Sequence, residues 1–321
     1  MTLKKASLRP VNWDTFTGQY NTVKSIQIAI KASQKRKEPL EHILLYGPPG
    51  LGKTTLANII AKDLNTNLKT TSGPALTRAG DLASILTSLE TGDILFIDEI
   101  HRLNKNVEEA LYPAMEDFTL DIVLGKGPGA RTLRLDLNPF TIIGATTKAG
   151  AISSPLRDRF GLVHRLVYYE PQDLEKIITN AGHILDAKLD KDSAKEIANR
   201  SRGTARIALK LLRRVRDYCL IEHKSKPNLE LTKQCLKFYQ VDDAGLDETD
   251  RRLLEAIINL HQGGPVGLQT LGSLISEDID TITDVNEPFL LQTGFLIKTS
   301  RGRVATPKAY SHLKIKQPRQ K

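Results

Sequence analysis

The chain has 321 residues, of which 40% are hydrophobic and 26% charged, a balance typical of globular proteins with two or three domains. No apolar run approaches the length of a membrane span, and Cys219 and Cys235 have no metal-ligand spacing, so we expect a cytoplasmic protein with free thiols, without zinc site or disulfide framework. The net charge of +9 favours a polyanionic partner such as nucleic acid but does not require one.

Residues 1–41 form a polar lead-in with one amphipathic helix, predicted around Val23 to Ala32. Arg9 lies ahead of this helix, in Leu8-Arg9-Pro10. It is either a solvated charge or part of a segment that folds over the base of a nucleotide, and the local sequence leaves both open.

The stretch 47–54, Gly-Pro-Pro-Gly-Leu-Gly-Lys-Thr, matches the phosphate-binding pattern G-x-x-x-x-G-K-[ST]. It follows an apolar strand, Ile43 to Tyr46, and precedes a helix that begins near Thr54. Gly50 and Gly52 allow backbone N–H groups to turn toward an anion, and the helix N-terminus adds its dipole. A plain Gly/Pro turn is the alternative, but this combination of strand, loop and helix predicts a polyphosphate site.

Three side chains of this loop have predicted roles. Lys53 would bridge the terminal phosphates, Thr54 would place its hydroxyl on Mg²⁺, and Thr55 would contact a phosphate nearer the base. The pattern therefore predicts ATP and Mg²⁺ as ligands.

A helix (Leu56 to Leu64), a strand (Leu68 to Ser72) and a helix (Asp81 to Leu89) lead to Asp93-Ile-Leu-Phe-Ile-Asp-Glu99, a buried strand that ends in two carboxylates. On its own such a run could simply end a strand. Following a phosphate loop in an alternating α/β pattern, it indicates that Asp98 holds the metal through water and Glu99 polarises the attacking water.

A helix is predicted from Ile100 to Met115, followed by Glu116-Asp117-Phe118 and a β-hairpin over residues 120–137. The hairpin strands alternate apolar and polar residues around a turn with the sequence Gly-Lys-Gly-Pro-Gly. Because the following segment is again a buried strand, the hairpin must project from the sheet. Its apolar face is covered either by this chain or by a partner.

The next strand, Phe140 to Thr147, ends in Thr146-Thr147 at the sheet edge where ligands of parallel sheets bind. These threonines either cap the following segment or sense the γ-phosphate. Residues 153–160 then place Arg157 and Arg159 on a short helix, as surface charge or, in an assembling ATPase, as an arginine finger for a neighbouring subunit. Arg159 is the candidate finger.

Four helical patterns without strands follow: Pro171 to Leu185, Lys191 to Arg202, Ala205 to His223 and Thr232 to Tyr239. They predict a small helical lid. Arg206 is either one more exposed arginine or a residue that points at the phosphates and reports the nucleotide state.

After a linker at residues 241–246, three helices and a basic two-stranded hairpin form a winged-helix pattern. Lys298, Arg301 and Arg303 lie in the wing. Cations of this kind suit contacts to the DNA backbone, although winged helices also bind proteins.

Together these motifs resemble the RuvB family of bacterial Holliday-junction branch-migration motors, which are AAA+ ATPases. The resemblance covers nearly the whole chain and is most specific in three motifs: GKGPGAR (125–131), SSPLRDRFG (153–161) and GGPVGL (263–268). It implies an α/β fold with an AAA+ P-loop core and a parallel sheet, a helical lid and a C-terminal winged helix. The implied domains are 1–169, 170–240 and 243–321.

The resemblance also implies residue roles. Lys53, Thr54 and Thr55 would contact the nucleotide, Thr147 would be the first sensor, Arg159 the finger and Arg206 the second sensor. The pocket would be completed by residues from three further segments: Leu8, Arg9, Glu116, Asp117, Phe118 and Tyr169. The hairpin would dock RuvA.

The sequence departs from the family pattern at three positions. Ala205 precedes Arg206 where proline is usual, Ser300 replaces a proline ahead of Arg301, and Lys298 replaces an arginine. These changes leave the expected fold intact. In the wing, Lys298 keeps the positive charge of an arginine but lacks its guanidinium fork.

The expected function is an ATP-dependent motor that drives branch migration of four-way junctions in recombination and repair. It would act on duplex arms as a homohexamer with RuvA, and with the RuvC resolvase as a further partner. Two alternatives stay open: a clamp-loader-like AAA+ ATPase, disfavoured by the lack of a C-terminal helical collar, and a DNA-binding regulator switched by nucleotide.

Overall fold

The computed structural model describes residues 7–124, 131–222 and 225–317. The chain divides into two compact units: unit 1 comprises Met1–Asp186 and Gly203–Leu209, and unit 2 comprises Ala187–Arg202 and Lys210–Lys321. Since this division cuts through the expected helical lid, the boundaries 1–169, 170–240 and 243–321 remain a prediction. Within the described residues, no helix is long and apolar enough to cross a membrane.

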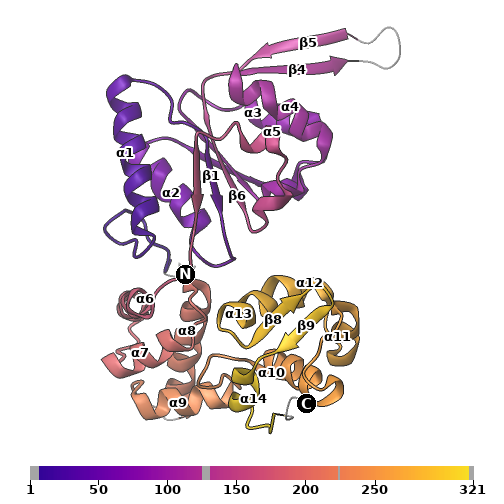
Figure 1. Ribbon diagram of the computed structural model, residues 1–321. Helices are drawn as coiled ribbons and strands as arrows, with labels where there is room; N and C mark the ends of the chain where they lie inside the picture. The colour runs from indigo at the N-terminus through magenta and orange to yellow at the C-terminus, as the bar shows by residue number, and fades with distance from the viewer. Residues whose placement is uncertain (1–6, 125–130, 223–224, 318–321) are drawn as a thin grey trace. The chain divides into compact units, whose positions relative to one another are not determined.

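A five-stranded parallel sheet forms the centre of unit 1, in the order β2-β3-β6-β1-β7 (Figure 1). Its strands are β1 (Ile43–Tyr46), β2 (Leu68–Ser72), β3 (Ile94–Asp98), β6 (Thr141–Thr146) and β7 (Leu162–Arg165). Tyr46 pairs with Thr146, and Ile97, just before Asp98, pairs with Gly144. Because the strands are parallel, Tyr46, Asp98 and Thr146 all lie at one edge of the sheet, where the predicted site residues begin.

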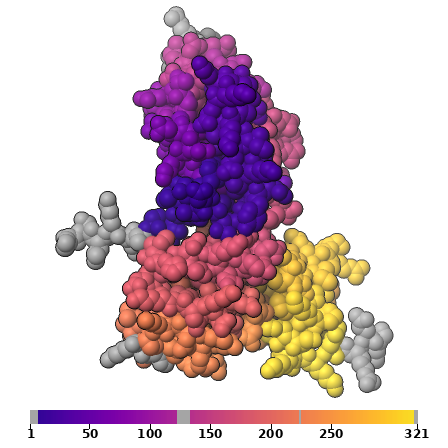
Figure 2. Space-filling view, turned by 90° about the vertical axis from the view of Figure 1, so that its left-hand side faces the viewer, coloured from indigo at the N-terminus to yellow at the C-terminus, as the bar shows by residue number. Residues whose placement is uncertain are grey.

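Helices flank this sheet. They are α1 (Tyr20–Arg36), α2 (Lys53–Leu64), α3 (Ala79–Leu86), α4 (Lys105–Glu116) and α5 (Ser154–Arg157). Helix α6 (Pro171–Ile184) follows the last strand and is the last helix that lies entirely in unit 1. Figure 2 shows the indigo N-terminal part of the chain, which includes α1, as a continuous patch on one face of unit 1.

The helix predicted from Ile100 to Met115 is interrupted. A 3₁₀ turn covers Ile100–Arg102, and α4 begins only at Lys105. The reason is Asn104, whose side chain accepts a hydrogen bond of 3.0 Å from the backbone N–H of Val107 and caps α4.

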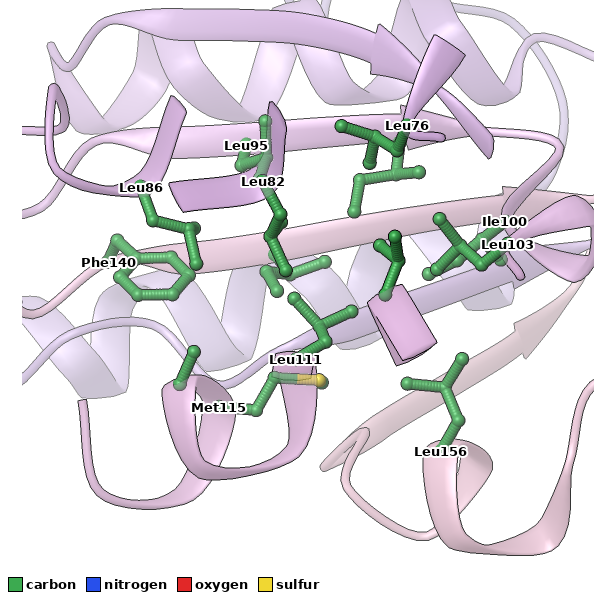
Figure 3. Packing of buried hydrophobic residues seen from close by; sticks show 14 of the residues in the cluster. Leu76, Leu82, Leu86, Leu95, Ile100, Leu103, Leu111, Met115, Phe140 and Leu156 are labelled. Carbon is green, nitrogen blue, oxygen red and sulfur yellow. The ribbon is translucent and has the colours of Figure 1, made fainter. Parts of the chain in front are cut away.

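A hydrophobic cluster packs α3 and α4 against the sheet (Figure 3). Leu82 and Leu86 come from α3 and Leu111 from α4, while Leu95 and Phe140 lie on the sheet side, and all five are at most 1% exposed. Each such side chain contributes roughly 1.5–3 kcal/mol by its burial. The cluster thereby fixes α4 relative to β3, two elements that carry candidate site residues.

The predicted hairpin is present as β4 (Thr119–Leu124) and β5 (Arg131–Asp136), which pair antiparallel and project from the rest of unit 1 (Figure 1). At its base Leu120 is buried, whereas Leu133, further out, is 45% exposed. The chain thus covers only part of the apolar face. The turn residues 125–130 of the GKGPGAR motif lie outside the described residues.

Unit 2 contains a group of helices, α7 (Lys191–Asn199) and α9 (Leu229–Phe238) together with most of α8 (Ala205–Glu222), whose first residues belong to unit 1. Cys219 of α8 and Cys235 of α9 are fully buried free thiols. Burial raises the pKa of the Cys235 thiol to about 12 and also raises the pKa of Cys219.

The remainder of unit 2 has the winged-helix arrangement. Its elements are α10 (Glu248–Glu255), α11 (Leu268–Ile275), α12 (Ile279–Thr281), α13 (Glu287–Gln292), β8 (Leu296–Thr299), β9 (Gly302–Ala305) and α14 (Pro307–His312). Helix α14 is absent from the sequence prediction. It begins at a readable signal, because Thr306 caps it by accepting a hydrogen bond from Ala309 N–H and Pro307 follows.

Arg202 joins the end of the α7 segment to the winged helix within unit 2. Its Nη2 lies 2.6 Å from Asp250 Oδ2 and 2.7 Å from Asp247 Oδ2, and its Nε donates to Gly245 O. Asn286 donates a hydrogen bond to the other oxygen of Asp250. Arg202 and Asp250 are both buried, so this ion pair is shielded from water.

Candidate nucleotide-binding site

The phosphate loop runs from β1 to α2. Gly47, Gly50 and Gly52 have φ angles of +143°, +82° and +98°, which side-chain-bearing residues rarely adopt. A Cβ at Gly50 would lie 2.9 Å from Arg206 Cβ, so glycine is required there for space as well as for conformation. Gly47 N–H donates to Thr146 O, which fixes the start of the loop to the edge of the sheet.

Lys53, the first residue of α2, points back into this loop. Its Nζ donates to Gly47 O at 2.7 Å and to Pro48 O at 2.9 Å. Burial lowers the pKa of Lys53 to about 8; nearby Asp98 opposes this shift and Arg206 adds to it. The ammonium group is therefore enclosed by the loop, with one carboxylate and one guanidinium close enough to affect its charge.

Thr54 and Thr55 lie in the first turn of α2, half-buried beside Lys53. Gly52 precedes the helix without a side-chain cap, so the first N–H groups of α2 have no partner from that position. Such unpaired N–H groups and the helix dipole favour an anion at this point.

The two acidic residues predicted at the end of β3 are consecutive and are joined by a local hydrogen bond. Asp98 is the last residue of the strand, and its Oδ1 accepts a hydrogen bond of 3.0 Å from Glu99 N–H. Glu99 has a φ of +49° and its carboxylate accepts a hydrogen bond from Arg102. This left-handed turn ends the strand at the edge where the phosphate loop begins.

The donor set near Lys53 suits Mg²⁺. Within the described ranges, no three His, Cys, Asp or Glu side chains cluster as a protein-only metal site. Mg²⁺ is usually bound by one or two protein oxygens together with substrate phosphates and water. The Thr54 hydroxyl and the Asp98 carboxylate are oxygen donors of that kind.

Thr146 and Thr147 differ in their surroundings. Thr146 is buried, and its hydroxyl lies 2.9 Å from His101 Nδ1 and accepts a hydrogen bond from Lys148 N–H. Thr147, the first residue after β6, is exposed. Thr146 therefore has a structural role at the strand end, and the Thr147 side chain lies on the surface.

The lead-in and Tyr169 border the loop from another side. Tyr169 is buried and its hydroxyl donates to Leu51 O at 3.0 Å; burial raises the pKa of this phenol. A Cβ at Gly52 would lie 3.3 Å from the Phe16 ring, so the lead-in also approaches the loop. Leu8 is half-buried and Arg9 exposed.

Arg206 is the lid residue that reaches the loop. Its backbone N–H donates to Gly50 O at 3.4 Å, and both residues belong to unit 1. Its side chain is exposed. The structure thus brings Arg206 together with Gly50 and Lys53.

Arg159 belongs to a different group of residues. Its Nη1 donates to Pro155 O at 2.6 Å, its Nη2 to Glu116 at 3.2 Å, and its guanidinium lies 4.3 Å from the centroid of the Tyr112 ring. Phe118, next to exposed Asp117, packs edge-on against Phe140. Arg159 and Glu116 are therefore neighbours of each other, with contacts distinct from those of Lys53.

In unit 2 the three wing cations differ in exposure. Arg303 is 12% exposed in its side chain and donates through Nε and Nη2 to buried Glu287. Lys298 Nζ lies 3.3 Å from the other oxygen of Glu287 with its side chain 59% exposed, and Arg301 is exposed at the wing tip. Arg303 therefore supports the wing, while Lys298 and Arg301 face solvent.

Sequence reasoning missed several residues around these groups. The Gln19 amide makes two hydrogen bonds to Val167, which anchor the lead-in at the end of the sheet. Tyr112 holds the Arg159 guanidinium, and Thr204 lies against Gly50. Of these residues, only Tyr112 could have been found from the sequence, because its spacing of four residues from Glu108 and from Glu116 places all three on one face of a helix.

The fold and this site define a P-loop nucleoside triphosphatase of the AAA+ class, fused to a winged helix. Family models match consecutive parts of the chain: the P-loop domain of the Holliday junction DNA helicase RuvB (8–166), the RuvB AAA lid domain (169–242) and the RuvB C-terminal winged helix domain (243–314). The chain belongs to the RuvB family, as its motifs predict, and its active site is that of a nucleotide-binding ATPase.

Solved structures agree with this result. The chain is similar to the Thermotoga maritima RuvB Holliday junction branch migration motor, with 49% sequence identity over 97% of this chain and 99% of that chain and a TM-score of 0.88. Two variants of that protein, one with lysine replaced by arginine and one with alanine replaced by serine, are also 49% identical, cover 97% of this chain and 99% of their own, and give TM-scores of 0.89.

Proposed function

We propose that this chain converts ATP hydrolysis into movement of Holliday junctions in recombination and repair. The observation that carries the proposal is the enclosure of Lys53 by the phosphate loop, close to Asp98, in a chain that also has a winged helix. A P-loop site provides the chemical free energy and a winged helix provides a DNA-binding surface.

The proposed chemistry assigns one task to each group. Lys53 and the N–H groups of the loop bind the β- and γ-phosphates, and Thr55 binds a phosphate nearer the base. Glu99 polarises a water molecule, whose oxygen forms a bond to the γ-phosphorus while the bond to the bridging oxygen of ADP breaks. Thr147 orients the water as first sensor.

Thr54 and Asp98 are the residues proposed to hold Mg²⁺, which when bound would neutralise the charge developing on the phosphates. Leu8, Arg9 and Tyr169 are proposed to enclose the base. Glu116, Asp117 and Phe118 are proposed to complete the pocket of a neighbouring protomer.

Two arginines are proposed to contact the γ-phosphate. Arg206, whose backbone contacts the phosphate loop, would act as second sensor and couple the γ-phosphate to the lid. Arg159 would reach the γ-phosphate bound by a neighbouring protomer, because its own contacts are with Glu116 and Tyr112. This arrangement requires an assembly, in which a closed ring gives every site a neighbour, and we propose a homohexamer.

The proposed partners follow the family. The duplex arms of a four-way junction would contact Lys298 and Arg301 through their phosphates, with Arg303 acting through support of the wing. The hairpin 120–137 would dock RuvA, RuvC would join the same assembly, and the protein would work in the cytoplasm.

Glu99→Gln tests the motor. The variant should bind ATP but lose hydrolysis and branch migration of a synthetic four-way junction, because the amide cannot polarise water. Glu109→Gln on α4 is the matched control, since Glu109 is an exposed residue that lies 3.8 Å from Lys105 and outside the site. Unchanged junction processing by Glu99→Gln would favour a nucleotide-switched regulator instead.

Leu133→Glu tests the hairpin. Leu133 is 45% exposed, and a charge there should prevent docking of RuvA while leaving the ATPase rate of the isolated protein intact. Arg134→Lys, which keeps the charge opposite Asp121, is the control. Normal recruitment of RuvA by Leu133→Glu would contradict the assignment of this surface.

A further inference from the structure

Three residues of α4 form a stripe on one face of the helix. Glu108, Tyr112 and Glu116 are spaced four residues apart, so their side chains lie above one another. Each of the three contacts the segment 153–159, which carries Arg159. The stripe is therefore a continuous contact between α4 and the segment that bears the candidate finger.

The Tyr112 ring is the central member of this stripe. The Arg159 guanidinium carbon lies 4.3 Å from the centre of the ring, a distance typical of cation–π contact. In the plane of the guanidinium, Nη1 donates to Pro155 O and Nη2 to Glu116. The ring covers one face while two acceptors fix the rotation of the group, so its orientation is defined.

The ring is itself held in place. The Tyr112 hydroxyl donates a hydrogen bond of 2.6 Å to Glu108, and Ser153 also donates to Glu108. Ser153 caps the helix α5 by accepting from Leu156 N–H. The side chain that orients Arg159 is thus tied to the start of the short helix that precedes Arg159.

The Arg159 side chain is 21% exposed, and its Nε is a buried atom without a hydrogen-bond acceptor. Part of the Arg159 side chain is therefore accessible from outside. An arginine side chain loses conformational entropy when it is fixed in one rotamer. A guanidinium that is already held in one orientation therefore loses less entropy when it contacts a phosphate.

We propose that Tyr112 is a positioning residue for ATP hydrolysis, which holds the Arg159 guanidinium in the orientation in which it meets the γ-phosphate bound by a neighbouring protomer. This inference rests on the proposed finger role of Arg159. The ring acts through Arg159 and touches neither ATP nor water, so its loss changes turnover on the neighbouring protomer.

The test compares Tyr112→Leu with Tyr112→Phe in the full-length protein, assembled on duplex DNA. Tyr112→Leu should lower kcat about tenfold with little change in KM, because the phosphate loop is intact but the finger is free to rotate. Tyr112→Phe keeps the ring and should recover most of the lost kcat. Equal kcat for Tyr112→Leu and wild type would overturn the proposal.

Mixing protomers distinguishes positioning from general damage. Tyr112→Leu protomers retain a working phosphate loop, and Lys53→Ala protomers retain a working finger. Mixed rings should therefore hydrolyse ATP faster than the sum of the two separate preparations. Absence of this gain would mean that Tyr112→Leu harms its own site, which would also overturn the proposal.

Arg159→Ala mixed with Lys53→Ala separates this inference from the proposed function. If that mixture is no more active than the sum of its two components, Arg159 does not act between protomers and the proposed finger role fails. If the mixture is more active than that sum but Tyr112→Leu shows wild-type kcat, only the positioning role of Tyr112 fails. In the Arg159→Ala background, Tyr112→Leu should have no further effect on kcat. Tyr112→Met, which preserves more apolar volume, replaces Tyr112→Leu if the latter does not fold.

Discussion

The ammonium group of Lys53 donates a hydrogen bond of 2.7 Å to the carbonyl oxygen of Gly47, the first residue of the same loop. The loop closes around its own lysine. The ammonium group that would contact the terminal phosphates is therefore held by backbone carbonyls and shielded from bulk water. This burial lowers the pKa of Lys53.

The pKa of Lys53, lowered to about 8 mainly by burial, predicts opposite pH effects on binding and stability. An unfolded lysine has a pKa of about 10.4, so between pH 8 and that value the unfolded state binds more protons and the free energy of unfolding rises with pH. ATP affinity should fall over the same interval as the charge is lost. Calorimetric titration with ATP at several pH values measures this fall in affinity. Lys62→Met, on the exposed side of α2, is the control and should show the same fall in ATP affinity as the wild type. A pH-independent affinity across this range would contradict the prediction.

Gly50→Ala should weaken ATP binding by about tenfold, because the left-handed backbone costs an L-residue roughly 1–2 kcal/mol. The added Cβ would also meet Arg206 Cβ at 2.9 Å and displace the residue proposed as second sensor. Fluorescent nucleotide titration measures the change. Gly80→Ala, in α3 with no atom within 4 Å of the new Cβ, should leave affinity unchanged.

The buried imidazole of His42 should make the protein less stable in acid. Its Nδ1 accepts from Ile142 N–H at 2.9 Å, its Nε2 contacts Met115 O at 3.0 Å, and burial lowers the pKa of the imidazole. Protonation would remove the acceptor, so the unfolded state binds more protons once the pH falls below about 6.5, and the free energy of unfolding decreases there.

Urea unfolding as a function of pH tests the role of His42. His42→Gln should lower stability at neutral pH and flatten the decline in acid, whereas His183→Gln on the exposed side of α6 should leave the decline as it is. An unchanged acid decline in His42→Gln would show that another group is responsible.

Arg202→Met should destabilise unit 2 by about 3–5 kcal/mol, because it leaves the buried carboxylate of Asp250 without its cation. Arg216→Met is the control, since Arg216 pairs with exposed Asp217 and should change stability by less than about 0.5 kcal/mol. Chemical denaturation measures both. Similar values for the two variants would contradict a structural role for the Arg202 cluster.

In the wing, Arg301→Gln and Arg303→Gln should separate DNA binding from stability. Arg301→Gln should remove about one phosphate contact, so the slope of the logarithm of the duplex-binding constant against the logarithm of salt concentration should change by about 0.9. Its thermal stability should stay that of the wild type. Arg303→Gln should lower thermal stability, because it removes both hydrogen bonds to buried Glu287. A stable Arg303→Gln variant with weakened DNA binding would reassign Arg303 as a direct contact.

The sequence was sufficient where local patterns determine structure. Continuous apolar runs identified β1, β3 and β6, and the glycines and Lys53 identified the loop between β1 and α2. Parallel pairing then brings Asp98 and the phosphate loop to one edge of the sheet, as a property of the topology.

Contacts between distant residues were not predictable in this way. The Gln19 bonds to Val167 and the contact of Tyr112 with Arg159 depend on how separate elements pack, which no local spacing encodes. The break before α4 depends on a single capping side chain, Asn104, within an otherwise helical pattern. Exposure likewise distinguishes Arg301 from Arg303, which look equivalent in the sequence.

The complete burial of Cys219 and Cys235 has a practical consequence for spectroscopy. Thiol reagents attack the thiolate, and burial raises the pKa of both native groups, so neither should be alkylated in the folded protein. A cysteine introduced on the surface, for example at Leu133 or Arg301, would then be the only fast-reacting position, and fluorescent dyes could be attached there without first removing the native thiols.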